Sequence, residues 1–201
     1  MASPDPGMDV SLLIWSTLVA GFALVAAGVP LSSFALFGLL ADVTERSGVP
    51  WWVGGAVAGA ATALGHGASY LFFAHLGRPV LSFLAARVPQ LVVPVDRLRL
   101  VLAHDWAWAT LLFLRWVGFG YAQVFWALAM AAIRRPVLLG LLLINDFLWA
   151  LVWTYAVAGL LEAVPGTAEW VTPGAALLLV LSLVGGAWGV YRHLRRTARR
   201  S

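Results

Sequence analysis

Residues 137–161 read VLLGLLLINDFLWALVWTYAVAGLL, an apolar run of 25 residues with one charged side chain, Asp146. A helix needs about 20 apolar residues, at 1.5 Å per residue, to cross about 30 Å of hydrocarbon, so this run predicts one transmembrane helix. Two similar runs, 51–76 and 171–191, predict two more spans. The chain is therefore expected to lie in a membrane.

The composition of the whole chain supports this prediction. Its 201 residues are 62% hydrophobic and 11% charged, whereas soluble domains average about 45–50% and 25%. Because cysteine is absent, disulfide frameworks and thiolate zinc sites are excluded. Thirteen arginines against nine acids give a net charge of +4, which falls mostly in short loops and a C-terminal tail. This distribution is typical of cytoplasmic loops and does not indicate nucleic-acid binding.

The first long uncharged run, residues 10–41, is too long for one span and too short for two. Pro30 divides it into a span at 10–29 and a remainder that begins a segment at 31–50. We expect 31–50 to form a re-entrant hairpin, which is stable only where its open backbone is buried in protein or lines a wet cavity. A signal peptide is the alternative for 10–29, but its leader carries two aspartates and no basic residue, the reverse of a signal sequence.

The charges of the loops predict which side of the membrane each loop faces. Residues 78–105 have a net charge of +2, residues 134–135 add +2, and the basic tail 192–201 adds +5. Since positive loops stay on the cytoplasmic side, all three segments should be cytoplasmic, including the C-terminus. The acidic loops 42–46 and 162–169, with net charges of −1 and −2, should face the opposite side.

Because the segments on both sides of residues 106–133 are predicted to be cytoplasmic, residues 106–133 should begin and end on the cytoplasmic face. We therefore expect a second re-entrant hairpin there, with its turn at Gly118–Gly120, since glycine permits tight reversals. Residues 78–105 mix arginine, proline and apolar side chains, which predicts amphipathic helices in the interface. The fold class is thus an all-α polytopic protein of the plasma (inner) membrane, a single domain over residues 1–201. About four transmembrane helices and two hairpins entering from opposite faces make up this domain, an arrangement similar to the inverted repeats of transporters.

Two charges lie deep inside the predicted membrane segments. Arg115 and Asp146 each stand ten residues inside their runs, about 15 Å deep if the segments are helical. An isolated charge there costs at least about 2.5–3.5 kcal/mol, so such residues normally face a cavity or each other. The arginine fork is the expected group for the phosphate of a lipid or for another anion. A plain ion pair that pins the hairpin to the helix is the alternative.

A histidine and two serines are further candidates. His66 lies in the small-residue stretch 65–69, which leaves room for a close helix or a substrate. Its ordinary pKa near 6.5 makes it the natural proton carrier, and a hydrogen-bonded packing residue is the alternative. His75 faces roughly the opposite side of the same helix, so the two cannot share one metal. Ser32 and Ser33 are expected to cap the N-terminus of a helix over 31–41. In the alternative interpretation, the N-terminus of this helix points at an anion.

The remaining features have simpler explanations. Most of the eleven tryptophans lie near proposed span ends, as in an interfacial belt. The arginine tail anchors the chain to anionic lipid at roughly 1 kcal/mol per arginine. No nucleophile-elbow or zinc-protease motif occurs in the right context, so the chain is not expected to be an enzyme, and no cofactor is expected.

Two motifs in the first half resemble a known family. GHGASYLFFAHLGRP at 65–79 is similar to the G-D-x-x-x-Y-x-x-G-R-x-x-G-R signature of the DedA family, also called the SNARE-associated or VTT-domain family. The stretch PLSS at 30–33, with Gly38, falls where that family has its P-x-P-x-E…G hairpin.

Two more motifs follow in the same order. LRWVG at 114–118 resembles x-R-F-x-P-G-x-R. Asn145, with Trp149 and Trp153 after it, resembles N-x-x-G-x-x-x-W. The resemblance extends over about residues 30–160, most of the chain.

The resemblance implies two re-entrant hairpins from opposite faces and the movement of a phospholipid or a polyprenyl (undecaprenyl-type) phosphate between leaflets, coupled to protons. Of the usual charged set of the family only Arg115 is retained, since Ser33 stands at the hairpin glutamate and His66 at the aspartate. The second arginine of the family has no counterpart, and Tyr121, Ala122 and Gln123 lie in its neighbourhood. The expected flippase therefore binds an anionic lipid phosphate and exchanges protons through His66 or a replacement carboxylate at Asp146. The substrate-binding residues expected on this basis are Arg115, Ser33, Gln123 and Asn145.

Two other functions remain open from the sequence. A membrane scaffold or assembly partner that transports nothing would be favoured by a dry ion pair between Arg115 and Asp146, whereas a wet cavity would favour transport. A haem b or quinone anchor would use His66 and His104. The expected partners are membrane lipids and the lipid phosphate, with a homo-oligomer also open and no nucleic acid.

Overall fold

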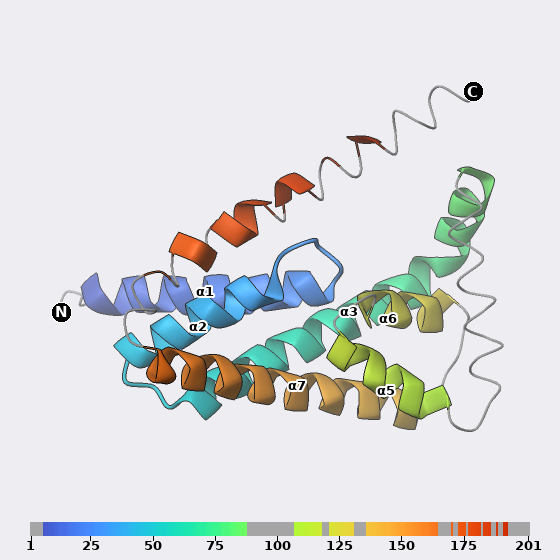
Figure 1. The fold of residues 1–201 in the computed structure, drawn as a ribbon. Helices are drawn as coiled ribbons and strands as arrows, with labels where there is room; N and C mark the ends of the chain where they lie inside the picture. The colour runs from blue at the N-terminus through green and yellow to red at the C-terminus, as the bar shows by residue number, and fades with distance from the viewer. Residues whose placement is uncertain are drawn as a thin grey trace, which may run out of the picture.

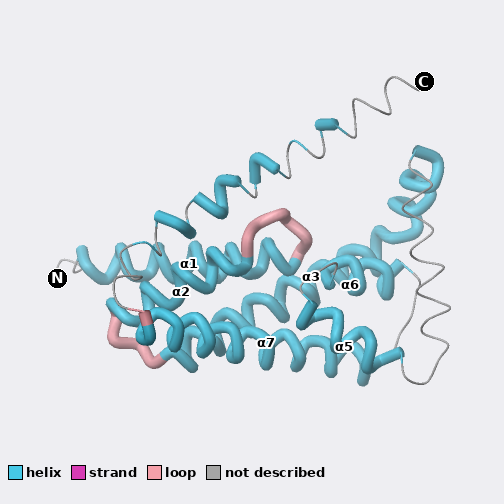
Figure 2. Tube along the Cα trace, viewed as in Figure 1, coloured by secondary structure: helices cyan, strands magenta, loops and turns pink. Residues whose placement is uncertain are grey.

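The computed structural model describes residues 6–87, 107–117, 121–130, 136–164 and parts of 170–192. Within these ranges the regular structure is α-helical and no strand occurs, which confirms the all-α prediction (Figure 2). The helices named in Figure 1 are α1 (Pro6–Ala26), α2 (Ser33–Arg46), α3 (Trp51–Arg87), α5 (Ala107–Val117), α6 (Tyr121–Met130) and α7 (Pro136–Ala163).

Helix α7 contains the whole apolar run 137–161 as one continuous helix, as predicted. It is long and apolar enough to cross a membrane, and no other helix in the described ranges meets the same criteria of length and hydropathy. The number of spans therefore stays a prediction, as does the span at 171–191, where the structure describes only short pieces.

The chain reverses direction between α1 and α2, near the Pro30 that divides the first apolar run (Figure 1). Between α1 and α2 the turn includes Gly28, whose φ of 98° lies in the left-handed region that favours glycine. Ser32 is the N-cap of α2, and its hydroxyl accepts a hydrogen bond from the Ala35 N–H at 3.3 Å, which confirms the predicted cap. Helices α5 and α6 are short, with 11 and 10 residues, and the expected turn at 118–120 lies outside the described residues.

Helix α3 differs from the expectation at its C-terminal end. The predicted span ended at residue 76, yet the helix continues to Arg87, so residues 78–87 are not separate interfacial helices. Pro79 lies inside it. An internal proline removes one backbone hydrogen bond and bends a helix without necessarily ending it, and the last turns of α3 bend away from the rest in Figure 1. Residues 88–106 lie outside the described part.

Small residues let α3 approach the helices on both of its sides. A Cβ added at Gly59 would lie 2.9 Å from the Cα of Phe147 on α7, and one added at Gly65 would collide with the Ala23 carbonyl of α1. Such small-residue faces are typical of closely packed membrane helices. The room at Gly65 is therefore occupied by a neighbouring helix, one of the two alternatives that the sequence left open.

Two apolar clusters form the interior. The first joins α1, α2, α3 and α7, and its aromatic rings contact in series, with centroids 5.0 Å apart for Phe22–Phe37 and 5.1 Å apart for Phe37–Trp149. The second joins α5, α6 and α7 around Phe125 and Leu142, both 0% exposed. The buried polar residues on α3, α5 and α7 contact members of both clusters, through Trp149 of the first and Phe125 of the second.

Candidate functional site

Three charged or titratable side chains from three helices meet in the interior. Asp146 on α7 is 0% exposed, and its Oδ2 lies 2.7 Å from Nδ1 of His66 on α3. Its other oxygen, Oδ1, lies 3.1 Å from Nε of Arg115 on α5. With the carboxylate ionised, the His66 Nδ1–H donates to it. We call His66, Arg115 and Asp146 the triad.

The two contacts of Asp146 differ in kind. The contact with His66 has the geometry of a hydrogen bond, whereas Arg115 Nε and Asp146 Oδ1 are within ion-pair distance but have no hydrogen-bond partner. Charge rather than an aligned bond thus holds the arginine to the aspartate. A buried donor and acceptor without an aligned hydrogen bond are rare in folded proteins.

Aromatic rings surround the triad. The Arg115 guanidinium carbon lies 3.6 Å from the centroid of the Trp149 ring and 5.1 Å from that of Tyr121. His66 stacks on Phe125, with centroids 4.5 Å apart and planes 7° from parallel. A cation over an aromatic face is attracted by the ring quadrupole. The apolar surroundings also strengthen every charge interaction in the triad relative to water.

Helix α7 contacts both short helices through polar groups. Asn145 bonds to α5, where its Nδ2 donates to the Leu112 carbonyl at 2.9 Å and its Oδ1 accepts from Trp116 Nε1 at 3.2 Å. The Tyr121 hydroxyl of α6 donates to the Leu142 carbonyl at 3.2 Å. One face of α7 therefore holds both helices of the predicted second hairpin beside the triad.

The structure brings together four of the six residues singled out from the sequence: His66, Arg115, Asn145 and Asp146. Gln123 is exposed on α6, and Ser33 is half-buried at the start of α2. Within the described ranges no hydrogen bond or ion pair connects either of them to the triad. Their role in binding a substrate stays a prediction.

The other two histidines considered from the sequence are not part of the triad. His75 is exposed, whereas His66 is buried, which agrees with their predicted opposite faces. His104, the second ligand of the haem alternative, lies outside the described residues. In the described part of the chain, no group of three or more His, Cys, Asp or Glu side chains is placed to hold a metal ion.

Sequence reasoning did not foresee the aromatic wall of the triad. The sequence places Trp149 only in a family motif, and the interfacial belt accounts for the tryptophans near the proposed span ends. Its position held a usable signal, because it lies in the middle of the run 137–161 and three residues after Asp146, on the same helix face. No comparable signal in the sequence pointed to Phe125.

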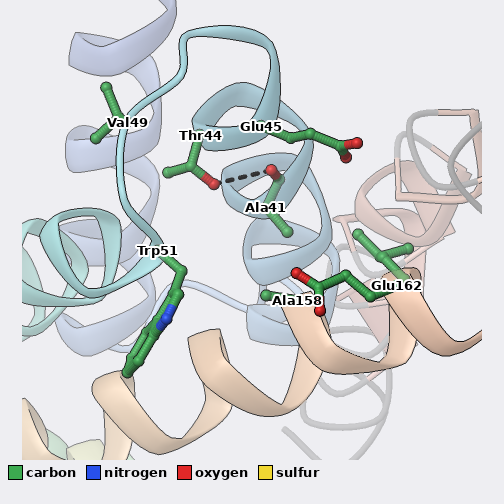
Figure 3. Close-up of a pocket in the computed structure, with 8 residues that line it drawn as sticks. Ala41, Thr44, Glu45, Val49, Trp51, Ala158 and Glu162 are labelled. Carbon is green, nitrogen blue, oxygen red and sulfur yellow. Dashed lines mark hydrogen bonds between the residues drawn. The ribbon is translucent and has the colours of Figure 1, made fainter.

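A separate cavity of about 230 Å³ lies near the C-terminal ends of α2 and α7 (Figure 3). It is lined by Ala41, Thr44, Glu45, Val49, Trp51, Ala158, Leu161 and Glu162. Its lining on α7 is about 20 Å from Asp146 along the helix, so it does not form part of the triad.

Comparisons with protein families, with curated proteins and with solved structures gave no match for this chain. The motifs quoted above are therefore the basis for any relation to the DedA family, which stays a prediction.

Proposed function

We propose that this protein spans the membrane several times and moves an anionic lipid phosphate between leaflets, with the triad as the site that responds to the phosphate. The observation that carries the proposal is the meeting of His66, Arg115 and Asp146, from three helices, inside a chain that is 62% hydrophobic. Ionisable groups inside a membrane protein are costly and mark substrate or ion pathways.

The outer surface of α7 supports a membrane location. Large apolar side chains are exposed along it at intervals of three or four residues, which places them on one face of the helix. They are Val137, Leu141, Ile144, Leu148, Val152 and Tyr155. A helix with charge on its inner face and apolar residues on its outer face suits contact with lipid chains and not with water.

Arg115 supplies the chemistry for a phosphate. Its planar guanidinium can donate two parallel N–H bonds to two phosphate oxygens, a fixed fork geometry that an ammonium group lacks. In the present arrangement Asp146 provides the negative charge beside it. An entering phosphate would compete with Asp146 for the arginine.

Charge balance explains the histidine. Arg115 and Asp146 together are neutral, and a singly charged phosphate would leave the buried site with one excess negative charge. A proton taken up by the His66–Asp146 pair would cancel that charge, and uncompensated charge is expensive in a low-dielectric interior. We therefore infer that phosphate entry is coupled to proton uptake at this pair.

The burial of the triad favours a second candidate, a membrane scaffold without transport. Asp146 is 0% exposed, and Arg115 is 8% exposed and stacked on Trp149. Such an enclosed pair could serve only to pin α5 to α7. The two candidates differ in what happens when the arginine is removed.

The test is leaflet transfer of a labelled polyprenyl phosphate, and separately of a labelled phospholipid, in vesicles that contain the purified protein. Arg115→Leu should abolish transfer, and Arg115→Lys should retain part of it, since lysine keeps the charge and loses the fork. Arg115→Leu removes the cationic partner of the buried Asp146 and lowers stability, so transfer is compared per folded protein, and Arg115→Lys keeps the positive charge. Arg46→Leu, at an exposed arginine on α2, is the matched control and should transfer at the wild-type rate.

Two results would contradict the proposal. Equal transfer by Arg115→Leu and the wild type would make the arginine a structural residue. Transfer no faster than in empty vesicles, for both lipids, would leave the scaffold as the function.

A further inference from the structure

Asn145 makes two hydrogen bonds to the helix that carries Arg115. Its Nδ2 donates to the carbonyl of Leu112, and its Oδ1 accepts from the indole N–H of Trp116. Asn145 is 7% exposed, and it precedes Asp146 on α7.

Both contacts require an amide at this position. A backbone carbonyl can only accept a hydrogen bond and an indole N–H can only donate one, so the partners fix the orientation of the amide group. A carboxylate would face the Leu112 carbonyl without a proton to donate, and an aliphatic side chain would satisfy neither partner. The amide is therefore specific to this geometry.

The two points of contact determine how α5 presents its arginine. Leu112 and Trp116 lie one turn apart along α5, and Arg115 lies three residues after Leu112, so both contacts are within one turn of the arginine. Hydrogen bonds between Asn145 and both residues resist rotation and sliding of α5 against α7. The arginine has no aligned bond of its own to Asp146 that could do this.

We propose that Asn145 is a positioning residue that holds Arg115 in register with Asp146 and with the entering phosphate, and that it does not itself bind the lipid. The effect of Asn145 on transport rests on the proposed function, whereas its contacts with α5 do not. It replaces the expectation from the sequence that Asn145 contacts the substrate.

The first measurement detects the hydrogen bond between Asn145 and Trp116 directly and does not depend on a transport assay. In full-length protein with ¹⁵N-labelled tryptophan in detergent micelles, Trp116→Phe identifies the indole N–H signal of Trp116. Asn145→Ala should shift that signal, because the N–H loses its acceptor. Thr154→Val is the matched control, since Thr154 is also buried on α7 and donates only within that helix, to the Ala150 carbonyl.

The second measurement separates positioning from general packing. In vesicles, Asn145→Ala should raise the apparent KM for the polyprenyl phosphate about five- to tenfold, the loss expected for a buried hydrogen bond, with kcat per folded protein unchanged. Trp116→Phe removes one bond at a half-exposed position, so it should raise the KM by a smaller factor even if Asn145→Ala folds poorly. Thr154→Val should leave the KM unchanged.

The outcomes are distinguishable. An unmoved Trp116 signal in Asn145→Ala overturns the proposed contact, and a moved signal with an unchanged KM overturns the positioning role. If the wild type transfers no lipid phosphate, the proposed function fails, and a moved signal then reduces Asn145 to a structural clamp.

Discussion

Arg46 and Asp42 form an ion pair of 2.8 Å on α2, and Arg115 and Asp146 form one of 3.1 Å between α5 and α7. The side chains of the first pair are 71% and 14% exposed, and those of the second are 10% and 0% exposed. The first pair joins neighbouring turns of one helix, which adds little to stability. The second joins two helices in the buried interior, where separating the charges is costly.

The helices that carry the two pairs are also held in place by different kinds of contact. Helix α2 is held by apolar contacts, with Phe37 placed between Phe22 and Trp149. Helix α5 also makes apolar contacts, through Leu111 in the second cluster, but it is held in addition through Asn145, Asp146 and the rings around Arg115. Since α2 shows that a short helix can pack here with its arginine at the surface, packing alone does not explain the buried arginine of α5. This contrast is the main physical reason for assigning it a function.

The largest expected effect comes from Asp146→Leu. This change leaves Arg115 buried without a counter-charge, and breaking a buried pair costs about 3–5 kcal/mol. Arg46→Leu, in the exposed pair, should change the free energy of unfolding by less than about 1 kcal/mol. Denaturant unfolding of both variants in micelles measures the difference.

A double variant, Arg115→Leu with Asp146→Leu, is the control for this result. Removal of both charges should recover much of the loss, because no unpaired charge remains. Equal destabilisation by Asp146→Leu and Arg46→Leu would mean that the two pairs are equivalent and that the contrast has no energetic basis.

A smaller effect on stability is expected on the apolar side. Phe37→Leu removes a ring from the contact series at a fully buried position and should cost about 1–3 kcal/mol. Leaflet transfer per folded protein should stay at the wild-type value, because Phe37 does not touch the triad. Unfolding and transfer are measured on the same preparation, and a transfer loss as large as that of Arg115→Leu would remove the distinction between the two regions.

The most limited effect on function, a change in pH dependence alone, is expected for His66→Gln. Glutamine can still donate to Asp146 but cannot take up a proton, so the change of transfer rate with pH should flatten over the range of about 5 to 8 in which histidines titrate. Substrate binding should be preserved. The matched control is His75→Gln, at an exposed histidine on the same helix, which should keep the wild-type profile. A wild-type profile for His66→Gln would leave His66 as a packing residue.

Local features of the fold could be predicted from the sequence because neighbouring residues determine them. The apolar run of α7, the cap at Ser32 and the reversal after α1 are of this kind. The end of α3 could not be predicted from the change in composition alone, since an apolar helix can continue through a proline such as Pro79.

The candidate site was predictable only in part, for a similar reason. The cost of an isolated charge in a membrane indicated that Arg115 and Asp146 have partners, and one alternative paired them with each other. The hydrogen bond from His66 to Asp146 joins residues 80 positions apart in the sequence. The stacking of the His66 ring on Phe125 depends on how the helices pack. Such contacts follow from tertiary packing, which spacing along the chain does not reveal.

The most direct test of the central claim is a density map of the protein in a lipid bilayer with a polyprenyl phosphate added. The account predicts phosphate density within hydrogen-bond distance of the Arg115 guanidinium, with Asp146 moved away from the arginine and still in contact with His66. A map in which Arg115 remains against Asp146 and phosphate density lies only at the two membrane surfaces would contradict it.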